Sequence, residues 1–99
     1  MSAYVIMIRD RLTDAEEFAT YGRLAKAARG ANPPKPLAFY GAKETLEGLP
    51  ADGAVILEFP DMAAAKAWYE SPDYQAAKVH RLAGADYRVI LVEGVPPAE

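Results

Sequence analysis

The sequence contains no cysteine and a single histidine among its 99 residues. Without cysteine there can be no disulfide, thiol nucleophile, thiolate metal site or iron–sulfur cluster. The chain also lacks a nucleophile elbow, a phosphate-binding glycine loop and paired histidines at metal-ligand spacing. We therefore expect no metal and no cofactor, since no feature of the sequence demands haem or flavin either.

Basic runs and long apolar segments are missing as well. The net charge is −3, from 11 basic and 14 acidic residues, and the Lys and Arg residues are dispersed. Nucleic acids and anionic lipids attract clustered cations, so neither is an expected partner. The apolar stretch after Met1 is too short for a signal peptide or a membrane span. The expected location is cytoplasmic.

The composition that remains is that of a soluble globular protein, with 52% hydrophobic residues. The length fits a single domain, which we place at residues 1–95, with a frayed C-terminal tail over 96–99. Apolar stretches predict strands over 3–9, 37–40, 54–59 and 86–93. Helical spacing and end signals predict helices over 14–29, 62–70 and 71–82.

Helix ends and breaks can be predicted from single residues. Thr13 and Glu16 have the spacing of a capping box for the first helix. Asp61 is expected to cap the second helix, and Ser71, followed by proline, the third. Residues 32–36 hold three prolines, which remove backbone donors, so this stretch is expected to be irregular.

The element order predicts an α+β fold, a ferredoxin-like βαββαβ sandwich with a four-stranded antiparallel sheet. Helices can cover only one face of the sheet, yet residues 5–8, 55–57 and 89–92 are apolar at successive positions. The uncovered face would expose on the order of several hundred Å² of apolar surface, about the most that monomers tolerate. A second copy is the simplest cover, which predicts a homodimer through the open face of the sheet, a dimeric α/β barrel. The alternative is a monomer with an apolar sheet.

Several segments resemble the DUF1330 family, a bacterial domain of unknown function. The most specific is Trp68-Tyr69-Glu70-Ser71-Pro72-Asp73-Tyr74-Gln75, and residues 57–60, 81–83 and 90–94 fit as well. The resemblance implies a dimeric α/β-barrel fold, similar to small cofactor-independent monooxygenases, dehydratases and isomerases, with no settled activity for the family. Similar proteins usually carry an arginine just before the glycine that follows the second strand, where this chain has Tyr40 and Gly41.

Two residues are weak candidates for catalysis. Glu58 lies within an apolar strand, and if Phe59 faces the helices, Glu58 points into the barrel and can act as a general base. Its alternative role is an ion pair with Arg88 or Arg9. His80 is the one side chain with an intrinsic proton-transfer range near neutral pH, although a solvated position near a helix end is the more ordinary role.

Four further residues are candidates for ligand binding. Tyr69 and Tyr74, beside the break between two helices, can wall a site for a planar ligand or serve as core anchors, whereas Trp68 is expected in the core. Tyr40 can add a hydroxyl to the barrel interior or simply pack. Arg81 can bind an acidic ligand, or pair with Glu70 or Asp73, which is the safer expectation.

Two functions remain open from the sequence. The first is a dimeric barrel that binds a small apolar or aromatic molecule between the sheet and the helices, with cofactor-independent acid–base chemistry of a monooxygenase or isomerase type. The second is a non-catalytic binding or structural protein in which the aromatic residues form the core. A cavity lined by convergent polar groups favours the first, and a filled core beneath Trp68 and Tyr69 favours the second.

Overall fold

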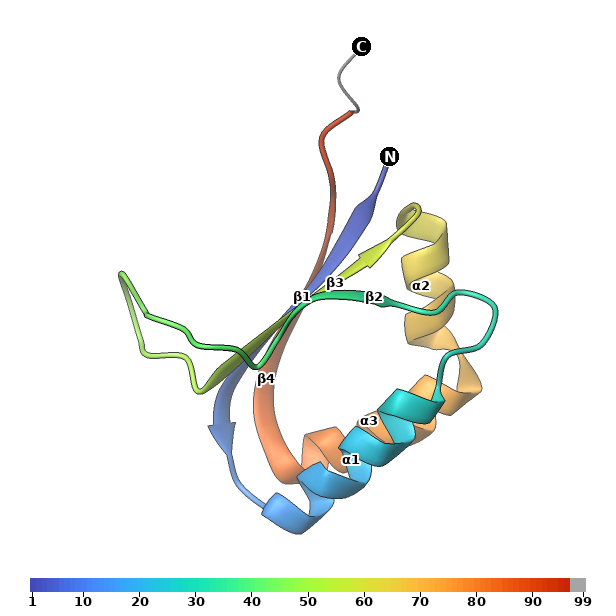
Figure 1. Cartoon of the computed structure of the whole chain (residues 1–99). Coiled ribbons are helices and arrows are strands. Elements are labelled where there is room, and N and C mark those ends of the chain that lie inside the picture. The colour runs from blue at the N-terminus through green and yellow to red at the C-terminus, as the bar shows by residue number, and fades with distance from the viewer. Residues whose placement is uncertain (97–99) are drawn as a thin grey trace.

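The computed structural model of the chain describes residues 1–96, and its helices lie on one face of a single sheet (Figure 1). The elements in chain order are β1 (Ala3–Leu12), α1 (Ala15–Ala27), β2 (Lys35–Phe39), β3 (Gly53–Phe59), α2 (Met62–Glu70), α3 (Pro72–Gly84) and β4 (Ala85–Glu93). The four strands pair antiparallel in the order β2-β3-β1-β4. This confirms the predicted α+β, ferredoxin-like fold.

The strands alternate between a face covered by helices and an open face. In β3, Val55, Leu57 and Phe59 are buried, whereas the residues between them are partly exposed. Strand register places Ile56, Ile6 and Ile90 in one row across β3, β1 and β4. The open face, as this surface is called below, consists of Tyr4, Ile6, Ile8, Ala54, Ile56, Glu58, Arg88, Ile90 and Val92. Its centre is apolar, as the strand patterns predicted.

The start of α1 differs from the capping box that we expected. Asp14, not Thr13, is the N-cap, and its carboxylate accepts hydrogen bonds from the backbone N–H groups of Glu16 and Glu17. The carbonyl of Gly84 accepts hydrogen bonds from the backbone of both Thr13 and Asp14, at 2.8 and 3.0 Å, which fixes this segment against the end of α3. A Cβ at Gly84 would lie 2.7 Å from the backbone nitrogen of Phe18, so only glycine allows this approach.

Other element ends also differ from the sequence prediction. Lys35 and Pro36, expected to be irregular, belong to β2. This is possible because β2 is an edge strand, where proline need not donate a hydrogen bond to a neighbour. The caps Asp61 and Ser71 are confirmed, at the starts of α2 and α3. The frayed tail expected at 96–99 lies, except for Pro96, outside the described residues.

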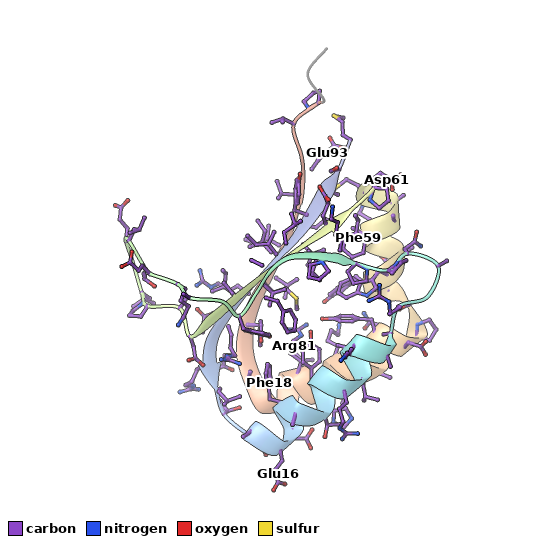
Figure 2. All side chains as sticks on the ribbon, in the orientation of Figure 1. Glu16, Phe18, Phe59, Asp61, Arg81 and Glu93 are labelled. Atoms are coloured by element: carbon purple, nitrogen blue, oxygen red, sulfur yellow. The ribbon has the colours of Figure 1, made fainter. Side chains whose placement is uncertain are left out.

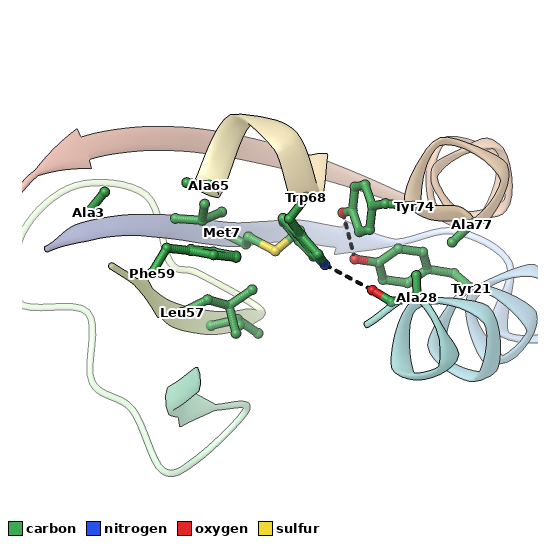
Figure 3. Close-up of a cluster of buried hydrophobic side chains, with 12 residues drawn as sticks. Ala3, Met7, Tyr21, Ala28, Leu57, Phe59, Ala65, Trp68, Tyr74 and Ala77 are labelled. Atoms are coloured by element: carbon green, nitrogen blue, oxygen red, sulfur yellow. Dashed lines mark hydrogen bonds between the residues drawn. The ribbon is translucent and has the colours of Figure 1, made fainter. Parts of the chain in front are cut away.

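The core is built around Trp68 of α2, as predicted (Figure 3). Its ring packs against Tyr74, with centroids 4.2 Å apart, and against Phe59 at 5.3 Å. Its indole N–H donates to the carbonyl of Ala28, at 3.2 Å, just beyond the end of α1. Because Phe59, Trp68 and Tyr74 are each no more than 5% exposed, the space beneath α2 is filled by side chains.

Candidate functional site

A polar cluster lies between the sheet and the helices α1 and α3. It consists of Tyr21 on α1, Tyr40 after β2, Tyr74 and Arg81 on α3, and Tyr87 on β4, and we call it the tyrosine–arginine cluster. Figure 2 shows Arg81 directed into the space between the helices and the sheet, with Phe18 of α1 on the same side. The cluster joins three of the residues singled out from the sequence, Tyr40, Tyr74 and Arg81, to two that were not.

The four tyrosines form two hydroxyl pairs. Tyr21 and Tyr74 share a hydrogen bond of 2.9 Å inside the core, drawn in Figure 3. Tyr40 and Tyr87 are hydrogen-bonded through their hydroxyls in a partly exposed position. Each pair uses one O–H hydrogen for its own bond, so one O–H per pair is left to donate to another acceptor.

Arg81 lies between the two pairs. Its guanidinium carbon is 5.9 Å from the ring centroid of Tyr21 and 5.3 Å from that of Tyr87. The residue is 4% exposed, and its Nε is buried with no hydrogen-bond partner among the residues that the structure describes. Neither expected partner, Glu70 nor Asp73, forms an ion pair with it, so the salt bridge that we considered the safer expectation is absent from the described part of the chain.

Burial raises the pKa of all four tyrosines, while the positive charge of Arg81 lowers the pKa of each of them. The hydroxyl bonds raise the pKa of Tyr21 and Tyr87 and lower that of Tyr74 and Tyr40. All four side chains are therefore neutral phenols at neutral pH, which makes them hydrogen-bond donors and not bases.

Aromatic side chains form the outer rim of the cluster. The ring of Phe18 stacks on Tyr87, with an interplanar angle of 13°, and meets Tyr40 edge-on. The guanidinium of Arg9 lies 4.9 Å from the Phe18 centroid and is paired with Asp52 at 3.0 Å. The cluster thus passes from the fully buried Tyr74 to a partly exposed aromatic rim.

Tyr40 is held in an unusual backbone conformation. Its φ is +53°, and it is the one non-glycine residue with positive φ in the described part of the chain. Such a conformation is an outlier for a bulky side chain and persists only where the surroundings enforce it. Here the Tyr40 N–H donates to the carbonyl of Ala54, and the ring packs so closely on Gly53 that a Cβ there would lie 2.9 Å from it. The backbone strain therefore serves to place the Tyr40 phenol beside Tyr87.

We expect Tyr40→Phe to lower the free energy of unfolding by about 1 kcal/mol, because it removes the hydroxyl bond to Tyr87 and keeps the ring. Urea denaturation measures this change. Tyr69→Phe is the matched control, with an expected change within about 0.5 kcal/mol, since the Tyr69 hydroxyl has no hydrogen bond within residues 1–96. Equal losses in both variants would contradict a positioning role for the Tyr40 hydroxyl.

Glu58 is separated from this cluster by the sheet. Phe59 is buried against the helices, so Glu58 lies on the open face, as the alternation of the strand required. Its carboxylate lies 3.8 Å from the ammonium of Lys35 on the neighbouring strand. Arg9 and Arg88, the partners suggested by the sequence, pair instead with Asp52 and Asp10. Glu58 and the Tyr69–Tyr74 segment therefore do not share one site.

His80 and Tyr69 also lie outside the cluster. His80 Nδ1 is 2.7 Å from a carboxylate oxygen of Glu17, so it joins α3 to α1. Tyr69 is partly buried, with its ring 5.5 Å from that of Tyr74 and the Lys78 ammonium 5.3 Å from its centroid.

Residues 1–96 contain no group of three His, Asp or Glu side chains placed to hold a metal ion. Within the same range no helix is long and apolar enough to cross a membrane. A surface groove of about 590 Å³ lies at the far end of β1, between residues 9–12 and 50–52, and it shares Arg9 with the rim of the cluster. Its charged side chains include Arg9 and Asp52, which pair with each other.

Comparison with known proteins gives a family and a fold. No curated protein matches the sequence. A solved structure of a protein of unknown function from Rhodopseudomonas palustris is 25% identical, covering 97% of this chain and 84% of that one with a TM-score of 0.73. A dimeric ferredoxin-like protein of unknown function from Thermobifida fusca is 20% identical, covering 94% and 91%, with a TM-score of 0.67.

A cofactor-independent oxygenase from Streptomyces nogalater, SnoaB, also shares the fold. It is 13% identical, and the match covers 97% of this chain and 94% of that one with a TM-score of 0.60. The family model for a domain of unknown function (DUF1330) matches residues 2–95. This chain therefore belongs to the DUF1330 family.

Proposed function

We propose that the protein is a homodimer that binds a small aromatic molecule at the tyrosine–arginine cluster and stabilises negative charge on it without a cofactor. The observation that carries this proposal is the buried guanidinium of Arg81 between two tyrosine pairs, with no partner for its Nε among the described residues. Buried polar groups normally have partners, and exceptions call for an explanation. A bound ligand would supply the missing acceptor.

The residues of the cluster favour stabilisation of charge over removal of a proton. Glu58 and His80, the two candidate bases, are on the open face and at the α1–α3 contact, and the phenols are neutral. An enol or phenol would thus lose its proton to solvent, and its oxyanion would be held by Arg81 and the free phenol donors. Donors fixed around a developing oxyanion are a common source of rate enhancement in enzymes.

The rim supports an aromatic ligand. Phe18, Tyr40 and Tyr87 are partly exposed rings that contact one another, so a planar molecule can replace these mutual contacts by stacking. Their side chains occupy the entrance to the cluster, and ligand entry requires Tyr40 or Phe18 to rotate outward. The core beneath Trp68 is filled, which is the outcome that favours the non-catalytic alternative for that part of the fold, and the proposal therefore places the site at the tyrosine–arginine cluster instead.

The open face supports a homodimer. Its central row of Ile56, Ile6 and Ile90 is uncovered in the single chain, with Ile90 56% exposed. The relative from Thermobifida fusca is a dimer. A second copy that packs its own open face on this row would complete a dimeric barrel and leave the cluster, on the opposite face, accessible in each subunit.

A thermal-shift series with 2-naphthol, 1,4-naphthoquinone, haem and flavin tests for aromatic binding. We expect the naphthalene probes to raise the melting temperature, because a ligand at 100 times its Kd stabilises the folded state by about 2.7 kcal/mol. Phe18→Leu, which removes the stacking ring, should abolish the increase. Val79→Ala, a change at an exposed position of α3, should leave it intact.

Two results would count against this function. One is an unchanged melting temperature with every naphthalene probe. The other is an increase of equal size in Phe18→Leu, which would locate the binding elsewhere. In either case the tyrosine–arginine cluster would be a structural feature of a protein with another role.

A further inference from the structure

We infer that the ligand of this site is an aromatic oxyanion, a carboxylate, phenolate or enolate, whose charged oxygen binds Arg81. This inference rests on the proposed function and adds the charge of the ligand to it. Arg81 is 4% exposed, and its Nε–H has no acceptor among residues 1–96. A guanidinium presents N–H donors in a fixed planar fork that matches a carboxylate or phenolate oxygen.

None of the ion pairs within residues 1–96 includes Arg81. Glu17 is paired with His80, and three surface ion pairs join Arg9 to Asp52, Arg11 to Asp86 and Arg88 to Asp10. Within the described residues Arg81 is thus a buried cation without a carboxylate. Removing an ion from water is costly unless an opposite charge compensates for it.

The aromatic rings beside Arg81 offset only part of the cost of burying its charge. The faces of Tyr21 and Tyr87 attract the guanidinium, yet a ring does not accept the in-plane Nε–H. An oxyanion would supply both an acceptor for the Nε–H and a negative charge opposite the guanidinium. A neutral ligand would supply the acceptor alone.

The free phenol hydrogens complete a site for an oxygen anion. In each hydroxyl pair one phenol donates to the other, and the phenol that accepts retains its own O–H to donate. One phenol lies on each side of Arg81, so one anion can meet a cation and a neutral donor together. Arg9, the second cation near the rim, is neutralised by Asp52 and is less suited to this role.

Paired probes of the same shape and different charge test the inference by calorimetry at pH 7. We expect 2-naphthoate to bind at least tenfold more tightly than 2-naphthamide to the wild-type protein. Arg81→Gln should reduce this ratio to about one, while Arg81→Lys should keep part of it. Arg11→Gln, which removes an exposed arginine from a surface pair, is the matched control and should keep the full ratio.

A second probe separates a carboxylate from a phenolate ligand. The colour of 4-nitrophenol reports whether it is bound as phenol or phenolate. Stabilisation by Arg81 should lower its pKa on binding by at least one unit in the wild type and by much less in Arg81→Gln. If the protein prefers 2-naphthoate to 2-naphthamide but does not lower the pKa of 4-nitrophenol, the site binds carboxylates. If it lowers the pKa of 4-nitrophenol without preferring 2-naphthoate, the site binds phenolates or enolates. Either result supports an oxyanion as the ligand.

The inference is wrong if naphthamide binds as tightly as naphthoate and nitrophenol binds in its neutral form. That result would leave the proposed binding of aromatic molecules intact. If no probe binds, neutral or charged, both the proposed function and this inference are wrong. If Arg81→Gln does not fold, as judged by circular dichroism, the two comparisons in the wild-type protein still decide the question.

Discussion

Changing Ile90 to aspartate is expected to convert the proposed dimer into a monomer of 10.7 kDa. Ile90 is at the end of the apolar row with Ile6 and Ile56 and is 56% exposed in the single chain. In a two-fold dimer the change occurs twice, so two carboxylates would be taken from water into an apolar interface. At a cost of about 2 kcal/mol each, the dimer dissociation constant would rise about 1,000-fold.

Sedimentation and light scattering at micromolar concentration measure this change. The control is Val79→Asp, which introduces the same charge at a position of α3 that is 62% exposed and faces away from the sheet. It should remain dimeric. A wild-type protein that is already monomeric, or a fully dimeric Ile90→Asp variant, would show that the open face is not the interface.

The fold could be predicted from the sequence because its determinants are local. The alternation of buried and partly exposed residues in β3 follows from the two-residue period of a strand, and the caps at Asp61 and Ser71 depend on residues three positions apart. The errors came from contacts between distant segments. Asp14 caps α1 in place of Thr13, in a segment that is hydrogen-bonded to the distant Gly84, and Pro36 belongs to a strand because that strand lies at the sheet edge.

The site was predicted only in part, for the same physical reason. Tyr40, Tyr74 and Arg81 were recognised as candidates, whereas Tyr21 and Tyr87 were not. The sequence pattern nevertheless indicated that both tyrosines face the core. Tyr21 follows Phe18 at helical spacing, and Tyr87 alternates with Val89 on the helix-facing side of β4. Only the fold brings Tyr87 to Tyr40, 47 residues earlier, and only the fold leaves Arg81 without the carboxylate that its neighbours in the sequence suggested.

Alkaline pH should unfold the protein steeply, because two tyrosines are buried as neutral phenols. Burial holds the pKa of Tyr21 and Tyr74 above the value of 10.0 that applies to the unfolded chain. Above pH 10 the unfolded state has released the two protons of this pair, which the folded state retains, and Tyr40 and Tyr87 add to the difference because their pKa is also raised. Tyr21 and Tyr74 by themselves therefore lower the stability of the folded state by about 2.7 kcal/mol for each further pH unit, twice the 1.36 kcal/mol of one proton, and this stabilisation is fully present below pH 10.

Urea denaturation between pH 8 and pH 11.5 measures the slope, while ultraviolet absorbance of tyrosinate follows ionisation. The loss expected from Tyr21 and Tyr74 by pH 11.5 is about 4 kcal/mol, a large part of the 5–15 kcal/mol available to a domain. The double variant Tyr21→Phe/Tyr74→Phe should lose the part of the slope that is due to this pair and keep the part due to Tyr40 and Tyr87, whose pKa is also raised by burial. Tyrosinate from this pair that forms before helical circular dichroism is lost would contradict the prediction, because it would mean that the folded core around Arg81 accepts a phenolate.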